Sequence, residues 1–272
     1  MRQFSRRDIL KLAALAPAAL AFSQTIVPGL PGGSAPNIIV LVFDAMSADN
    51  LSLYGYPRRT SPNLERLAQR STVYHSHDSA GNFTSPGTAS LLTGLYPWTH
   101  RAINFNGQVA PAFAQRNIFA LFGRSYDRIG FGQNLLAEFL LSEFRSGLDV
   151  HLPPASFSAR AQLLGTSFKN DTPVSYYALD DFFFRPSATP RSLVVGLMEH
   201  ALLGFRLESL STVGYHNGIP RTNNKIYYRL EDIFRGLTSQ VRQFQRPFLA
   251  YFHIWSPHAP YLPSAKFEDR FA

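Results

Sequence analysis

Asp44 stands directly after the apolar run at residues 37–43 (NIIVLVF). A continuous β-branched and apolar run is typical of a strand that is buried on both faces of a parallel sheet, and open α/β sheets bind ligands at the carboxyl ends of their strands. A carboxylate at that edge is a natural hard ligand for a divalent cation. An aspartate at a strand end also commonly forms a turn or caps a helix, and the residue alone does not choose between these roles.

Thr84 and Ser85 precede Pro86, at the expected start of a helix that ends near Gly94. A hydroxyl at a helix N-terminus meets free N–H groups and the positive end of the helix dipole, which favour its ionisation and the binding of an anionic ester. A bound metal would lower the pKa of the hydroxyl further. The alternative is a simple Thr/Ser cap before a proline in the first turn.

His258 lies in a proline-stiffened segment, residues 256–263 (SPHAPYLP), just after a second apolar run at Phe248–Ile254. A histidine on such a loop can bind an anion or donate a proton. It can equally be a structural loop histidine, so its chemistry depends on what lies beside it.

The elements that must position these residues alternate between strands and helices. The strand at residues 37–43 is followed by a helix at 61–68, which Ser61 caps and Pro62 opens. A weaker strand is expected at 127–132, and an amphipathic helix at 222–244 precedes the strand at 248–254. This alternation predicts an α/β fold with a largely parallel sheet flanked by helices. Residues 152–220 are interpreted as an insertion beside the core.

Composition excludes several classes of site. The 272-residue chain has 45% hydrophobic and 16% charged residues, which fits a globular protein with a real core. It has no cysteine, so disulfides, thiolate zinc sites and thiol nucleophiles are excluded. The net charge of +8 favours anionic partners, but the charge is spread along the chain, so nucleic-acid binding is not indicated.

Residues 1–35 are predicted to be a targeting segment and linker. Ser5–Lys11 (SRRDILK) fits a twin-arginine export signal, and the apolar stretch Leu12–Phe22 is too short to span a bilayer. Ala19–Ala21 supplies a small-x-small cleavage pattern, and residues 28–36 are rich in Gly and Pro. We therefore expect a periplasmic or extracellular protein with no membrane span, which an uncleaved signal could tether. An ordinary N-terminal helix is the alternative.

Taken together and in order, these segments resemble the sulfatase/alkaline-phosphatase superfamily. The resemblance rests on residues 37–44, 53–56 (LYGY), 61–68 (SPNLERLA), 84–86 (TSP), 89–97 (ASLLTGLYP) and 257–261 (PHAPY). It implies an alkaline-phosphatase-like catalytic domain over residues 36–272. It also implies that Asp44 is a metal ligand, that Thr84 is the nucleophile and a metal ligand, and that His258 contacts the anionic group of the substrate. The implied cofactor is a divalent cation: Ca²⁺, Mg²⁺, Mn²⁺ or Zn²⁺.

The chain also departs from the family pattern. Ala45 replaces a second aspartate, and Thr88 stands where the formylglycine motif has arginine. Residues 130–134 (GFGQN) do not match the family's lysine-and-histidine segment. No late Asp-His or Asp-Asn pair follows His258, so we expect a sheet and a metal site that are incomplete at the C-terminus, with the remaining ligands beyond residue 272.

Three functional hypotheses follow. The first is an exported hydrolase of sulfate or phosphate esters of glycans or lipids, which uses a Thr84 nucleophile. The second is a transferase of the phosphoethanolamine or phosphoglycerol type, because threonine cannot become formylglycine. The third is a truncated, non-catalytic relative that binds anions.

Overall fold

A computed structural model describes residues 35–105, 107–159, 201, 205, 208, 214–223 and 226–270. The chain divides into two compact units, Met1–Asn37 and Ile38–Ala272. The predicted targeting segment and most of the predicted insertion at 152–220 lie outside the described residues. In the described part, no helix is both long and apolar enough to cross a bilayer.

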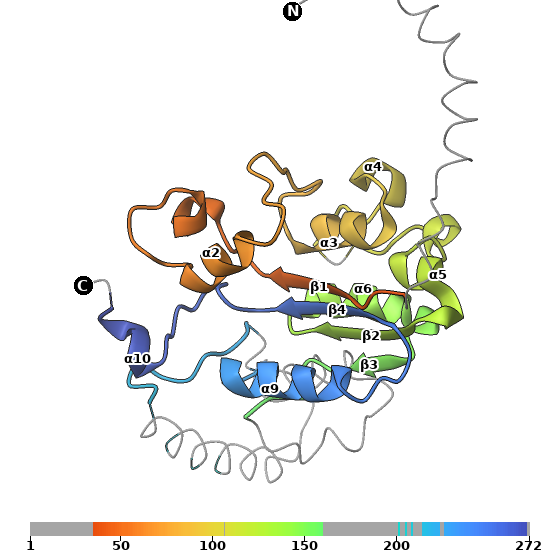
Figure 1. Cartoon of the computed structure of the whole chain (residues 1–272). Coiled ribbons are helices and arrows are strands. Elements are labelled where there is room, and N and C mark those ends of the chain that lie inside the picture. Colours follow the sequence, from red (N-terminus) through yellow and green to blue (C-terminus); the bar gives the residue numbers. More distant parts are fainter. Residues whose placement is uncertain are drawn as a thin grey trace, which may run out of the picture. The chain divides into compact units, whose positions relative to one another are not determined.

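The second unit is built on a four-stranded parallel sheet in the order β1-β4-β2-β3 (Figure 1). The strands are β1 (Ile38–Phe43), β2 (Asp127–Gly132), β3 (Val150–Leu152) and β4 (Phe248–Ile254). The predicted α/β class, with a parallel sheet between helices, is confirmed. The three predicted strands form as β1, β2 and β4, whereas the short edge strand β3 was not predicted.

Helices cover both faces of the sheet. The α-helices are α2 (Pro62–Ala68), α3 (Thr84–Thr93), α4 (Pro97–His100), α5 (Ile118–Phe122), α6 (Leu135–Glu143), α9 (Leu230–Val241) and α10 (Ala265–Glu268). Short 3₁₀ turns are η1 (Ala48–Asn50), η2 (Ser52–Tyr54), η3 (Pro111–Phe113), η4 (Gly123–Ser125) and η5 (Arg145–Gly147). Figure 1 shows α9 on one face of the sheet and α3 on the other.

Strand β4 lies between β1 and β2, and every one of its residues is buried. Its side chains alternate between two hydrophobic clusters because successive residues of a strand point to opposite faces. Leu249 and Tyr251 pack with residues of α3 and α6, whereas Ala250 and Phe252 pack with residues of α9. This alternation sends His253 to the same face as Tyr251, toward α3.

Strand β1 does not fit the prediction of a strand that is buried on both faces. It lies at one edge of the described sheet, and Ile39 and Leu41 are 55% and 41% exposed. Its alternate residues Ile38, Val40 and Val42 pack against the cluster of α3 and α6. The apolar run therefore predicted the strand correctly, but the prediction that both of its faces are buried was wrong.

The predicted helix at 222–244 is wrong in its first part. Arg221 and Tyr227 form an antiparallel bridge, the N–H of Ile226 donates to the Thr222 hydroxyl at 3.2 Å, and α9 begins only at Leu230. Thr222 and the asparagine that follows it favour a turn, since their side chains compete with helical hydrogen bonds. The apolar spacing continues through this turn because Ile226 and Tyr228 are buried there.

Two helix ends test the predicted capping residues. Gly94 caps α3 in the left-handed conformation with φ +68°, and its N–H donates to the Ser90 carbonyl at 2.8 Å, as predicted. Helix α2 begins at Pro62, also as predicted, but the Ser61 side chain makes no capping hydrogen bond. The Ser61 hydroxyl instead accepts from the N–H of Leu53 at 3.0 Å, which ties the preceding loop to the helix.

Candidate functional site

Asp44 lies at the carboxyl end of β1, where the sequence placed it. Its backbone N–H donates to the carbonyl of Ile254 at 2.9 Å, so the β1–β4 pairing continues to the last residue of both strands. Its side chain is only 11% exposed. The carboxylate therefore sits at the edge of the sheet where α/β proteins bind ligands.

Thr84 is the first residue of the ten-residue helix α3. The preceding residue, Phe83, has an extended backbone and supplies no side-chain cap. The first N–H groups of α3 therefore have no capping side chain and remain available to an anion, together with the positive end of the helix dipole. The neighbouring Ser85 hydroxyl is buried and donates to the Phe105 carbonyl at 2.6 Å, so it is already occupied.

Asn134 joins the two predicted site residues. Its Nδ2 donates to Oδ2 of Asp44 at 2.5 Å and to Oγ1 of Thr84 at 3.2 Å. Its Oδ1 accepts from the N–H of Leu136 at 2.8 Å and so caps α6. The cap fixes which end of the amide faces the site, since the oxygen is engaged with the helix and the NH₂ group must point toward the carboxylate and the hydroxyl.

His253 approaches Asp44 from the neighbouring strand. Its Nε2 lies 3.5 Å from Oδ2 of Asp44, and its Nδ1 lies 3.0 Å from the hydroxyl of Tyr251. The residue is 2% exposed, and Nε2 has no hydrogen-bond partner. Parallel pairing explains the encounter, because His253 is opposite Val42 in the register and Asp44 lies two residues farther along β1.

His258 follows β4 on the loop that the sequence indicated. Its backbone N–H donates to the Trp255 carbonyl at 2.9 Å, and its ring packs on the Trp255 ring with 4.1 Å between the centroids. Nδ1 lies 2.9 Å from the carbonyl of Ala259. The loop contacts and the stacking hold the imidazole beside the site.

The three predicted site residues share one cleft. It has a volume of about 900 Å³, and it is lined by Asp44, Thr84, His253 and His258 together with the loop at residues 77–83. The loop passes so close to the start of α3 that a Cβ on Gly81 would lie 2.7 Å from Pro86 Cβ. The sequence therefore predicted the location of the cleft, although the catalytic and binding roles of its residues stay predictions.

The electrostatics of the cleft favour an ionised Asp44. Burial raises the pKa of its carboxyl, but the nearby His253 imidazole and the Asn134 amide stabilise the carboxylate and lower it more. The charge of His258 contributes in the same direction, so the pKa of Asp44 lies below its ordinary value. At neutral pH Asp44 therefore presents a carboxylate to the Thr84 side of the cleft.

Two members of the site were not singled out from the sequence, namely Asn134 and His253. Asn134 was noted only as part of a segment that fails to match the family. A signal for it existed, since an Asn that follows a strand and precedes a helix is both a cap and a residue of the ligand-binding edge. His253 lies inside an apolar run and looks like any buried histidine until the strand register is known.

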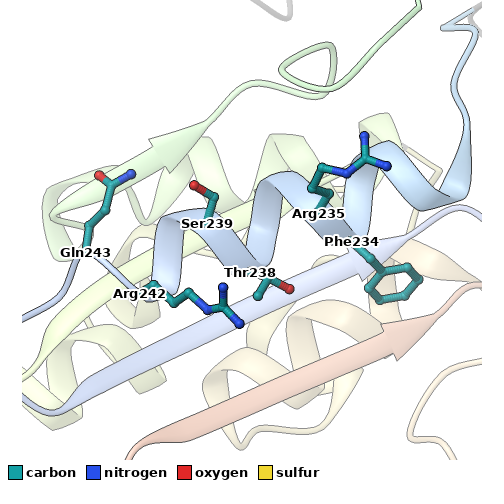
Figure 2. A pocket seen from close by; sticks show the side chains of 6 residues that line it. All are labelled: Phe234, Arg235, Thr238, Ser239, Arg242 and Gln243. Carbon is teal, nitrogen blue, oxygen red and sulfur yellow. The ribbon is translucent and has the colours of Figure 1, made fainter.

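A second hollow, of about 560 Å³, lies along α9 and shares no lining residue with this cleft (Figure 2). It is lined by Phe234, Arg235, Thr238, Ser239, Arg242 and Gln243. All six residues come from one helix and the two residues after it. Among its lining side chains there is no carboxylate and no histidine, so it lacks the mixture of groups that the cleft at Asp44 has.

Comparison with known proteins gives the family. The sulfatase family model matches residues 36–272, which is most of the chain. The chain belongs to the sulfatase family. The pig N-acetylgalactosamine-6-sulfatase is 36% identical over 92 residues, which cover 34% of this chain and 17% of that enzyme. The N-acetylgalactosamine-6-O-sulfatase of Bacteroides thetaiotaomicron is 23% identical over 267 residues, which cover 86% of this chain and 50% of that enzyme.

One solved structure is also similar, the phosphonate monoester hydrolase of Agrobacterium radiobacter. It has a TM-score of 0.49 and 19% sequence identity, and the match covers 83% of this chain and 42% of that one. The chain spans about half the length of the Bacteroides thetaiotaomicron sulfatase, although the match covers 86% of the chain itself.

Sulfatases and their relatives generally use a divalent metal, and the cleft offers several donor atoms for such a cation. Asp44 offers a carboxylate oxygen, Thr84 a hydroxyl oxygen, and His253 an orphaned buried nitrogen that faces Asp44. Within the described residues, no three His, Cys, Asp or Glu side chains form a cluster that could hold a metal. The donors present therefore fit one side of a cation site and do not surround an ion alone.

Proposed function

We propose that this protein is an exported, divalent-metal-dependent hydrolase of sulfate or phosphate esters, with Thr84 as its nucleophile. The observation that carries the proposal is the Asn134 amide, which donates to both Asp44 and Thr84. It holds the Thr84 hydroxyl beside an ionised carboxylate, at a helix N-terminus and inside a cleft. A buried donor shared by two such groups positions a nucleophile, and an ordinary helix cap would not need it.

In the proposed reaction, the anionic ester lies at the N-terminus of α3, where the free N–H groups and the helix dipole favour negative charge. Thr84 Oγ1 attacks the sulfur or phosphorus atom, and its proton passes to solvent in the cleft. The bond to the leaving alcohol breaks, and His258 protonates the leaving oxygen. Water then cleaves the Thr84 ester, which releases inorganic sulfate or phosphate and restores the hydroxyl.

Asp44 and Thr84 would hold the divalent cation on this side of the cleft. When bound, the cation supplies a lower pKa for the threonine hydroxyl and compensates negative charge on the ester. The other groups act without it. Asn134 orients the hydroxyl, and the 77–83 loop lines the cleft beside the start of α3.

The substrate class follows from the charge and from the relatives. The net charge of +8 favours an anionic substrate, and the curated relatives are named for a sulfated sugar. We therefore propose a sulfated or phosphorylated glycan or lipid. The twin-arginine pattern at Ser5–Lys11 supports export to the periplasm or the medium. Fractionation of cells that express Arg6→Lys/Arg7→Lys tests export, since the double variant should remain in the cytoplasm.

The nucleophile is tested by turnover of aryl sulfates and aryl phosphates after reloading with metal. Thr84→Ala should lower kcat by about 10³-fold or more, because it removes the proposed nucleophile. Ser85→Ala is the matched control: it also removes a hydroxyl from the first turn of α3, but one that is engaged with the Phe105 carbonyl. Quenched reactions of the native protein should show Thr84 carrying one sulfuryl or phosphoryl group by peptide mass spectrometry.

The same assay separates the competing functions. Equal losses in the two variants, or an unmodified Thr84 peptide during turnover, would refute a threonine nucleophile. A product formed on an added alcohol in preference to water would identify a transferase. Metal binding without turnover of any ester would support a non-catalytic, anion-binding relative.

A further inference from the structure

His253 is a buried polar group that lines the cleft and that the proposed reaction does not use. It is 2% exposed, and its Nε2 has no hydrogen-bond partner although it faces a carboxylate. A buried polar atom that is left unsatisfied destabilises the fold, so such an atom in a cleft indicates a ligand. A ligand of this nitrogen would lie between it and the carboxylate of Asp44.

The 3.5 Å separation of His253 Nε2 and Asp44 Oδ2 is informative. It is longer than the roughly 2.7–3.2 Å of an N–H···O hydrogen bond. It matches two ligands of one metal ion: with metal–nitrogen and metal–oxygen bonds of about 2.1 Å, a tetrahedral angle separates the two ligand atoms by about 3.4 Å. The two atoms thus have the spacing of ligands that share a cation.

The other ring nitrogen is held as a metal-binding histidine requires. Nδ1 lies 3.0 Å from the hydroxyl of Tyr251, which is fully buried and is also hydrogen-bonded to the Thr88 side chain. The phenol oxygen of Tyr251 has a lone pair that can accept the Nδ1 proton. The tautomer with the proton on Nδ1 leaves a lone pair on Nε2, and metal-ligating histidines almost always donate their second N–H in this way.

Other buried histidines of the described chain differ from His253. His100 uses both ring nitrogens, with Nε2 2.9 Å from the Ser90 hydroxyl and Nδ1 3.0 Å from the N–H of Ala102. The Nε2 of His151 also has no hydrogen-bond partner, but it lies only 2.9 Å from Glu138 Oε1, which is too close for two tetrahedral ligands of one metal ion. Neither lines the cleft, whereas His253 does.

We propose that His253 Nε2 is a ligand of the divalent cation that binds at Asp44. The inference rests on the proposed function only in that a cation is expected beside this carboxylate. It narrows the choice of metal, because imidazole is a usual ligand of Zn²⁺ and is also found on Mn²⁺, whereas Ca²⁺ and Mg²⁺ prefer all-oxygen sites. It also gives β4 a direct part in the site, which otherwise consists of residues that follow strands or begin helices.

The test is pulsed electron paramagnetic resonance of the intact protein after chelation and reloading with Mn²⁺. A directly bound imidazole gives a nitrogen hyperfine coupling that a distant histidine does not. We expect this coupling in the native protein, its loss in His253→Gln, and at least a 10-fold weaker Mn²⁺ affinity in that variant. His151→Gln is the matched control, since it changes another buried histidine beside a carboxylate, and it should keep both the coupling and the affinity.

Each outcome decides the matter. A coupling that persists in His253→Gln, the absence of any nitrogen coupling, or a native protein that binds no Mn²⁺ would overturn the proposal. A thermal melt of His253→Gln checks folding, and Tyr251→Phe provides a second variant, which should weaken the coupling without removing the ligand. Thr84→Ala should keep the nitrogen signal while losing turnover, so the inference and the proposed nucleophile can fail independently.

Discussion

Asn134 has two separable roles, and replacing it by serine or by alanine should distinguish them. Its Oδ1 caps α6 at 2.8 Å from Leu136 N, and its Nδ2 donates to Asp44 and Thr84. Serine is a good N-cap but is too short to reach the other two side chains, and alanine performs neither role. The cap is worth about 1 kcal/mol, and a hydrogen bond to a charged group about 1.5–3 kcal/mol.

The free energy of unfolding should therefore fall by about 1.5–3 kcal/mol in Asn134→Ser and by about 2.5–4 kcal/mol in Asn134→Ala. Urea titration followed by tryptophan fluorescence measures both values, because Trp255 is 3% exposed at the end of β4 and reports on the site. An unchanged m-value would show that the unfolded states are comparable. Turnover should fall equally in the two variants, since both lack the donor to Thr84.

The result that would refute this reasoning is a serine variant that keeps native turnover. The amide would then serve only as a helix cap, and the shared contact with Asp44 and Thr84 would have no functional weight. Equal free energies of unfolding in the serine and alanine variants would refute the proposed capping role, since the cap would then contribute nothing to the stability of α6.

Three further predictions concern the sheet that carries the site. Burial raises the pKa of Glu138, so the stability that its protonated form contributes is present below the ordinary value of 4.5 and is lost as pH rises. In urea titrations at several pH values, the free energy of unfolding of Glu138→Gln should rise relative to that of the native protein by at least about 1 kcal/mol between pH 4 and pH 8. Hydrogen bonds from Arg128 lower the pKa of Asp149. Asp149→Asn should therefore cost about 1 kcal/mol at pH 7, an amount discounted for solvent exposure, and the cost should shrink as pH falls below the ordinary value of 3.8. Phe131 is fully buried in β2, and calorimetry of Phe131→Ala should show a loss of about 3–5 kcal/mol, whereas a loss under 1 kcal/mol would contradict the assigned core.

Strands β1 and β4 could be predicted from the sequence because they are apolar runs, β2 was a weaker candidate, and the three-residue strand β3 (VHL) was not predicted because it is too short to show a pattern. Helix starts and ends were predictable where proline or glycine imposes a backbone geometry, as at Pro62 and Gly94. The prediction failed where spacing alone was used: Ile226 is buried in a bridged turn, yet it fits a helical stripe. Apolar periodicity reports which residues are buried, and a turn against the core buries residues as a helix does.

The residues of the candidate site also divide into those that the sequence located and those that it did not. Asp44, Thr84 and His258 could be located because each follows or begins an element whose end was visible in the sequence. Asn134 and His253 could not be assigned, because their contacts depend on the strand order β1-β4-β2. Nothing local indicates that β4 lies between strands that are far apart in the sequence, and only that order brings residue 253 beside residue 44.

The order of the strands also explains why the cleft forms at this place. Asp44 follows β1, His253 is the second-to-last residue of β4, and Asn134 follows β2 by two residues, so adjacent strands deliver one polar group each to the same edge. Parallel strands make this possible, because all of their carboxyl ends meet at one edge, whereas antiparallel neighbours would send alternate groups to opposite edges. Helix α3 then supplies Thr84 above that edge. A shift of β4 by one residue would turn His253 to the α9 face and remove it from Asp44, so the register of this strand is as much a part of the site as its side chains.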